Sequence, residues 1–279
     1  MKIVSLSMAS LVVASSLFAT VDIDKKVFAF EKQRFLANQG ITISEVKIFK
    51  KKKLSVDGWY GYVLRIKANV PGRGVVSGED TLFSNGKVVA PELLSMKDGT
   101  SFKSVLEAKV TNSYYKKENL IAGNPDAKNR VVIFSDPLCP ACVATLPSVI
   151  KKVTDNPKEI ALYYYHFPLL QLHPAADTVS KAMVVLRKKG IKDVEMKIYT
   201  TNFSQYFSSK EKDPAKILAG VNKVFGTKIT LKEINAIDVG NEVKGDVIMG
   251  KQVRIQGTPT IFVNGTNDKT RRLFGALAK

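Results

Sequence analysis

Residues 131–142 read Val-Val-Ile-Phe-Ser-Asp-Pro-Leu-Cys-Pro-Ala-Cys and carry the strongest structural signal in the chain. The β-branched and aromatic residues at 131–134 predict a buried strand, and the Ser-Asp-Pro-Leu run that follows ends it. From Cys142 onward apolar residues recur at helical spacing, which predicts a helix whose first turn contains Cys139. A second apolar run at 160–167 predicts another buried strand. Together these segments predict a strand–helix–strand unit with parallel strands.

Cys139 and Cys142 are the only two cysteines of the sequence. A bridge across two intervening residues removes little entropy from the unfolded chain, so structural stapling explains this pair poorly. Unpaired amides and the helix dipole favour a thiolate at Cys139, and the thiolate is the attacking species. Pro140 suits the first helical turn, and Cys142 can attack the resulting mixed disulfide. The pattern therefore predicts a redox centre whose only cofactor is the Cys139–Cys142 disulfide itself.

A metal site is the alternative for the two thiols. Zinc in structural sites takes four protein ligands, and only His166 and His173 could complete such a set. We expect no metal, and we expect both histidines to be helix-capping or surface groups. Asp136 is expected to stabilise the turn before Pro137, with a role as proton acceptor as the alternative.

Composition and charge bound the other classes of function. The chain has 279 residues, 45% of them hydrophobic and 24% charged, which is globular and predicts about two domains. The net charge is +18, and its sharpest cluster, Lys50–Lys53, is expected in a loop. Proteins that bind nucleic acids usually concentrate basic residues on one face, whereas here the lysines are spread along the chain. A solvated surface is favoured, no nucleic-acid partner is expected, and acidic partners or an anionic membrane surface are the alternative.

The N-terminus predicts export. Lys2 is followed by a short apolar stretch that ends at Leu17-Phe18-Ala19, which is typical of a cleavable signal peptide over residues 1–19. An uncleaved interfacial helix is the alternative. No later window approaches 18 apolar residues, so we expect no membrane-spanning segment in the mature protein.

Two motifs also carry a resemblance to a known family. The Asp-Pro-Leu-Cys-Pro-Ala-Cys run at 136–142, together with Gly-Thr-Pro-Thr at 257–260, resembles the thioredoxin-fold disulfide oxidoreductases of the bacterial periplasm, and most of all the DsbG/DsbC family. The Gln-Gly-Ile-Thr-Ile run at 39–43 is similar to the start of the dimerisation domain of that family. The resemblance implies that Pro259 is cis beside Cys139, and that Thr258 offers backbone groups to a substrate chain. It also implies a periplasmic homodimer joined through its N-terminal domains.

The sequence departs from the family in three places. The active-site dipeptide is Pro140-Ala141, and Ala141 supplies neither a hydroxyl nor an imidazolium to a thiolate. Ile133 stands where thioredoxins keep a buried aspartate, which leaves the proton acceptor for Cys142 unassigned. Only four residues follow Gly275, so the closing helix of the fold is expected to be shortened or absent.

We expect four segments along the chain. They are the signal peptide at 1–19, an N-terminal dimerisation domain at 20–100, a linker helix at 101–122, and a thioredoxin-like catalytic domain at 123–279. The first domain is expected to be α+β and cystatin-like, with a helix at 25–38 and strand-like runs at 41–49, 59–70, 74–83 and 87–90.

The catalytic domain is expected to be α/β, with a helical insertion at about 174–252. Within that insertion, Asp213-Pro214 predicts a helix start, and Thr230 with Glu233 predicts a capping box.

The favoured function is an exported thiol:disulfide oxidoreductase of the isomerase or reductase type, acting on cysteine-containing exported proteins. Such an enzyme requires a membrane redox partner of the DsbD type, whereas an oxidase requires one of the DsbB type. The motif does not encode the direction of electron flow, because a change of about 30 mV in potential is worth about 1.4 kcal/mol for this couple. A DsbA-like dithiol oxidase and a redox-independent chaperone are therefore the alternatives.

Overall fold

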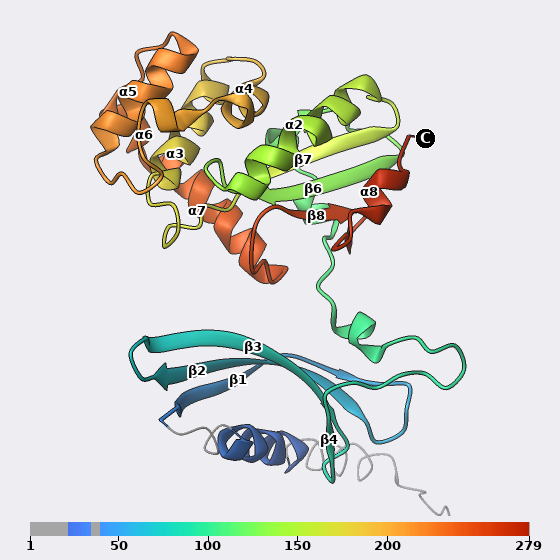
Figure 1. The fold of residues 1–279 in the computed structure, drawn as a ribbon. Coiled ribbons are helices and arrows are strands. Elements are labelled where there is room, and N and C mark those ends of the chain that lie inside the picture. Colours follow the sequence, from blue (N-terminus) through green and yellow to red (C-terminus); the bar gives the residue numbers. More distant parts are fainter. Residues whose placement is uncertain (1–21, 35–39, 279) are drawn as a thin grey trace, which may run out of the picture. The chain divides into compact units, whose positions relative to one another are not determined.

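The chain divides into two compact units at residue 107, shown in a computed structural model that describes residues 22–34 and 40–278 (Figure 1). The predicted signal peptide at 1–19 lies outside the described residues. No helix within the described ranges is long and apolar enough to cross a membrane.

The N-terminal unit is a helix packed on a four-stranded antiparallel sheet. Residues 22–34 are helical, and the sheet order is β1-β2-β3-β4. Its strands are β1 (Thr42–Lys53), β2 (Tyr60–Val70), β3 (Gly74–Ser84) and β4 (Val89–Ala90). Val27 of the helix packs with Tyr62 and Leu64 of β2, and the Tyr62 hydroxyl donates to Asp24 at 2.8 Å. The unit is therefore α+β. The end of the predicted helix at 25–38 falls among residues that are not described.

The Lys50–Lys53 cluster extends strand β1, and our expectation of a loop there is wrong. Each of the four lysines pairs with a residue of β2, from Lys50 opposite Val63 to Lys53 opposite Tyr60. β1 is the edge strand, where lysines discourage pairing with another chain. The Lys50 ammonium also donates to the carbonyls of Leu106 and Glu107, at 3.2 and 3.0 Å. Part of the charge cluster thus ties the end of this unit to its sheet.

The predicted linker helix at 101–122 is also wrong. The segment contains three short 3-10 turns, at Phe102–Leu106, Asn112–Tyr114 and Lys117–Asn119. Its apolar residues do not share one helix face, because Leu106 packs into the core of the N-terminal unit whereas Val110 and Tyr114 pack into the other unit. A single helix could not send these side chains into two different cores.

The C-terminal unit is built on a five-stranded mixed sheet with the order β5-β7-β6-β8-β9. The strands are β5 (Leu120–Ala122), β6 (Asn129–Ser135), β7 (Ile160–His166), β8 (Thr260–Val263) and β9 (Thr266–Asn267). β6 and β7 are parallel, as predicted, and helix α2 (Pro140–Asp155) connects them. β8 pairs antiparallel with β6, which brings the chain just before Thr260 to the end of β6 where α2 begins.

Helices fill the segment between β7 and β8, where the sequence predicts the helical insertion. They are α3 (Ala176–Lys188), α4 (Val194–Thr200), α5 (Pro214–Phe225), α6 (Leu231–Ile234) and α7 (Ile237–Gln252). The Asp213 cap and the Thr230–Glu233 capping box are both present as predicted. Figure 1 shows α3 to α6 gathered at one end of the sheet. The last described helix, α8 (Arg272–Ala276), has five residues, so the closing helix is short.

Candidate functional site

Cys139 and Cys142 lie at the start of α2, as predicted. Cys139 is the N-cap residue, Pro140 opens the helix, and the amide of Val143 donates to the Cys139 carbonyl at 2.9 Å. Both cysteines are free thiols in the structure. Cys139 retains 8% of its surface, whereas Cys142 is fully buried. A reactant can therefore approach only Cys139 from solvent.

The second part of this site is the Thr258–Pro259 segment, which precedes β8 and lies far from the cysteines in sequence. The Thr258–Pro259 peptide bond is cis, as the resemblance implies. The Cys139 thiol donates to the Thr258 carbonyl at 3.5 Å, although 119 residues separate the two. Pairing between β6 and β8 explains this approach, because it fixes both segments at the same end of the sheet.

Cys142 has a strongly perturbed thiol. Burial raises its pKa to about 12, and a neighbouring charge on Cys139 acts in the same direction. The nearby Ser135 and Thr258 hydroxyls, and the backbone at Asp136, oppose that rise. The two thiols are thus distinct: one is accessible at a helix start, and the other is a buried thiol that holds its proton at neutral pH.

Asp136 does more than the turn role predicted for it. Its carboxylate is fully buried. One oxygen accepts from the Leu138 amide at 2.7 Å, which is the predicted turn. The other accepts from the Leu169 amide at 2.7 Å and lies 3.0 Å from Nδ1 of His173. Asp136 therefore holds the loop after β7 against the segment that leads into Cys139.

Both histidines differ from our expectation of capping or surface roles. His173 is largely buried against Asp136, because the loop after β7 folds back onto the site. His166 is fully buried at the end of β7, where burial and the nearby Arg187 guanidinium lower its pKa well below the usual value. Within the described residues, no group of three or more histidine, cysteine, aspartate or glutamate side chains is arranged to hold a metal ion.

Asp246 of α7 binds the same end of β7, and its ionisation makes the stability of the fold depend on pH. It accepts from the His166 amide at 2.9 Å, and burial raises its pKa to about 7. An unfolded aspartate titrates near about 3.9. Between about pH 4 and 7 the folded protein keeps a proton that the unfolded chain has released. The free energy of unfolding should therefore fall as pH rises through this window and level off above it.

Asp246→Asn is expected to remove this slope. Urea unfolding at several pH values between 4 and 7 should show a fall in stability that is smaller by about 2 kcal/mol than in the wild type. Asp155→Asn is the control, because the Asp155 side chain is 54% exposed. If the slopes of Asp246→Asn and wild type coincide, Asp246 does not titrate as its burial demands.

Two further groups at the site carry no local sequence signal. The Arg271 guanidinium donates to the Pro259 carbonyl at 2.6 Å. Burial lowers the pKa of Arg271, and the nearby Asp268 and Cys142 oppose that shift. The Tyr199 hydroxyl, from α4, donates to Ser135 Oγ at 2.7 Å, and Tyr199 lies near enough to Cys142 for the two to interact electrostatically. Both residues lie far from the cysteine motif in sequence, so only the fold reveals them.

Comparisons with known proteins agree with this architecture. Residues 116–274 match the thioredoxin family model. The chain is 25% identical over 156 residues to a protein named probable disulfide bond formation protein D from Bacillus anthracis, covering 51% of this chain and 68% of that relative.

The solved structures that match the chain are more distant in sequence. A thioredoxin-like oxidoreductase from Silicibacter pomeroyi has a TM-score of 0.47 and 18% identity, over 57% of this chain and 87% of that chain. The catalytic domain of Proteus mirabilis ScsC has a TM-score of 0.45 and 21% identity, over 56% of this chain and 83% of that chain. The match over residues 116–274 covers more than half of the sequence, and the chain therefore belongs to the thioredoxin family.

Proposed function

We propose that this protein is an exported thiol:disulfide oxidoreductase of the isomerase or reductase type, close to the DsbG/DsbC family. The observation that carries the proposal is the pair of free thiols at the start of α2, with Cys139 against the Thr258 carbonyl beside a cis-proline. Backbone groups at Thr258 are available to align a client chain next to Cys139.

The reaction uses the two thiols in turn. The Cys139 thiolate attacks a client disulfide, forms a mixed disulfide and releases one client sulfur as a thiolate. Cys142 then loses its proton to water and attacks Cys139 Sγ. The Cys139–Cys142 bond forms, the bond to the client breaks, and the second client sulfur leaves as a thiolate. In isomerisation a client thiolate instead attacks the client sulfur of the mixed disulfide. A new client disulfide forms, Cys139 leaves as a thiolate, and the protein ends reduced.

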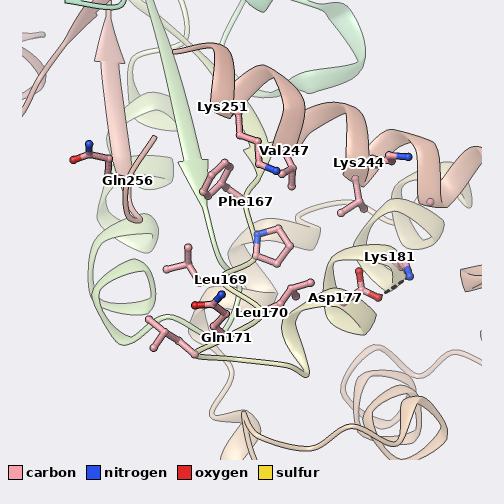
Figure 2. Close-up of a pocket in the computed structure, with 14 residues that line it drawn as sticks. Phe167, Leu169, Leu170, Gln171, Asp177, Lys181, Lys244, Val247, Lys251 and Gln256 are labelled. Carbon is pink, nitrogen blue, oxygen red and sulfur yellow. Dashed lines mark hydrogen bonds and ion pairs between the residues drawn. The ribbon is translucent and has the colours of Figure 1, made fainter. Parts of the chain in front are cut away.

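A groove beside the site supports binding of unfolded clients. The loop after β7 and helix α7 line a groove of about 660 Å³. Figure 2 shows Leu169 and Leu170 on one side and Val247 on the other, with Lys244 and Lys251 along α7. An apolar client segment with acidic neighbours fits this lining. The Asp136 carboxylate accepts from the amide of Leu169, so a hydrogen bond connects the groove directly to the cysteine motif.

The N-terminal unit supports the isomerase type. It is a separate compact α+β unit, which agrees with a role in joining two copies. We therefore propose a homodimer through residues 20–100 with a cystatin-like fold. Electrons for an isomerase or reductase come from a membrane partner of the DsbD type.

A DsbA-like oxidase is the second candidate. The relatives in Bacillus are named for disulfide bond formation, and the Arg271 guanidinium near Cys142 favours thiolates over the disulfide. An oxidase passes its electrons to a partner of the DsbB type. A chaperone that holds clients without redox chemistry is the remaining candidate, and the same groove would serve it.

Trapping in the periplasm tests the reaction. The Cys142→Ser variant should accumulate covalent adducts with cysteine-containing exported proteins, because Cys139 still attacks and nothing resolves the mixed disulfide. The matched Cys139→Ser variant should form none, since Cys142 is buried. Equal adduct levels in the two variants would contradict the assignment of Cys139 as nucleophile.

The redox state of the wild-type pair in cells separates the candidates. A mostly reduced pair supports the isomerase or reductase, whereas a mostly oxidised pair supports the oxidase. Full suppression of client aggregation by a variant with both cysteines replaced by alanine would support the chaperone.

A further inference from the structure

Cys142 must lose its proton inside the protein core before it can resolve a mixed disulfide. It is fully buried, and so is Ile133, at the position where thioredoxins keep an aspartate. Stabilisation of the buried thiolate must therefore come from neutral groups around the sulfur or from charges further away.

Three buried hydroxyls form a continuous chain behind that sulfur. Ser135, at the end of β6, lies within hydrogen-bonding reach of the Cys142 thiol. The Tyr199 hydroxyl, from α4, donates to Ser135 Oγ at 2.7 Å. The Tyr164 hydroxyl, from β7, lies 2.9 Å from the Tyr199 hydroxyl. All three side chains are at most 1% exposed, so water does not compete for these bonds.

Counting hydrogens fixes the direction of the chain. Each hydroxyl has one hydrogen to donate. Tyr199 uses its hydrogen toward Ser135, so Tyr164 must be the donor in the bond between the two tyrosines. Ser135 accepts from Tyr199, which leaves its own hydrogen for Cys142. Every hydrogen therefore points along the chain toward the sulfur, and bonds aligned in this way strengthen one another.

The backbone fixes the positions of the residues that carry the three hydroxyls. The Ser135 carbonyl accepts from the Phe167 amide at 2.8 Å, and β6 pairs with β7 along its whole length. Tyr164 is also held by an edge-to-face contact with the His166 ring, with the ring centroids 4.9 Å apart. The Ser135 backbone is thus fixed, and rotation of its side chain away from Cys142 would break the hydrogen bond from Tyr199.

We infer that Ser135, Tyr199 and Tyr164 are positioning residues for the resolving step, forming a directed chain of hydroxyl donors that ends on the Cys142 sulfur and stabilises its thiolate. The inference rests on the proposed two-thiol reaction. The chain itself transfers no net proton, because its hydrogens stay on their oxygens. The proton of Cys142 goes to water, and the incoming donors hold the charge that remains.

Other groups around the sulfur act on the same charge. Cys139 on the same helix opposes ionisation of Cys142. The Thr258 hydroxyl, the backbone at Asp136 and the Arg271 guanidinium favour it. At the far end of the chain, Tyr164 is influenced in opposite senses by two buried charged groups, Glu195 and Arg187. The test must therefore remove single hydroxyls and leave all charges in place.

A single-turnover reaction of the reduced protein with dithiobis(nitrobenzoate) isolates the resolving step. Cys139 attacks the reagent and releases one coloured thiolate in a first phase. Cys142 then attacks Cys139 Sγ and releases the second thiolate in a second phase. Tyr199→Phe should slow the second phase about threefold at every pH from 6 to 8. A pKa higher by about one unit cuts the thiolate fraction about tenfold, and the more basic thiolate recovers about threefold of that in nucleophilicity. The first phase should stay within about twofold of the wild type, since Cys139 lies outside the chain.

Two further variants test the chain as a unit. Ser135→Ala should slow the second phase at least as much as Tyr199→Phe. The double variant should be no slower than Ser135→Ala alone, because the tyrosines act only through the serine. Tyr165→Phe is the matched control, since it also removes a buried tyrosine hydroxyl, which donates to the Tyr114 carbonyl at 2.8 Å.

The outcomes separate this inference from the proposed function. The inference is overturned if Tyr199→Phe slows the second phase no more than Tyr165→Phe does, or if the effects of Ser135→Ala and Tyr199→Phe multiply. If the wild-type protein lacks the first phase, the two-thiol reaction itself fails, and the inference fails with it.

Discussion

Replacement of Asp136 with asparagine is expected to lower the free energy of unfolding by about 4 kcal/mol. The carboxylate is fully buried and accepts from the amides of Leu138 and Leu169, both at 2.7 Å. Asparagine keeps the shape but offers only one acceptor oxygen. Whichever way its amide turns, one of these two partly buried backbone N–H groups faces an NH2 group and loses its partner. Bonds to a charged acceptor are the strong ones, so this loss is large.

Urea unfolding of the reduced protein measures this loss. Asp213→Asn is the matched control, because Asp213 caps α5 at an exposed position and asparagine caps equally well. Its stability should change by less than about 0.5 kcal/mol. A loss below about 1 kcal/mol for Asp136→Asn would mean that the carboxylate does not anchor the loop after β7.

Local patterns predicted the part of the fold that surrounds the cysteines. The apolar run at 131–134, the helix after Cys142 and the run at 160–167 form β6, α2 and β7 with parallel pairing. The sequence also predicts the helix caps at Asp213 and Thr230 correctly. In each case the signal and the structure span the same few residues, so tertiary contacts had little to override.

Sequence patterns failed where distant contacts decide the structure. Residues 101–122 have helical spacing, yet Leu106 and Val110 serve different cores. Lys50–Lys53 resembles a loop by charge, yet pairing with β2 keeps it in a strand. His173 has no local partner, and its contact with Asp136 requires the whole loop after β7. Spacing along the chain contains none of this information.

The candidate site divides in the same way. Cys139 and Cys142 are visible in the sequence because their chemistry depends on one helix start. Ser135 and Tyr199 are 64 residues apart and meet only because α4 packs against α2, close to the end of β6. A buried tyrosine looks like an ordinary core residue in sequence, and only the position of its hydroxyl gives it a role.

Gly123→Ala is expected to lower the free energy of unfolding by at least about 4 kcal/mol. Gly123 has a φ of +82°, and a Cβ built there would lie 2.0 Å from the Ile160 carbonyl oxygen and 3.0 Å from the Ala161 Cα. These are backbone atoms of β7, so no rotamer change relieves the clash. Gly190→Ala is the matched control, with a φ of +76° and nothing within 4 Å of the added Cβ.

The control should lose only about 1 kcal/mol, the cost of the left-handed backbone alone. The difference between the two variants therefore isolates the close approach between Gly123 and β7. Thermal and urea unfolding measure it. Equal losses would mean that β5 can move away from β7 at no cost. A large difference would show that the chain entering the C-terminal unit is held tightly against β7, the strand that carries Tyr164 and His166.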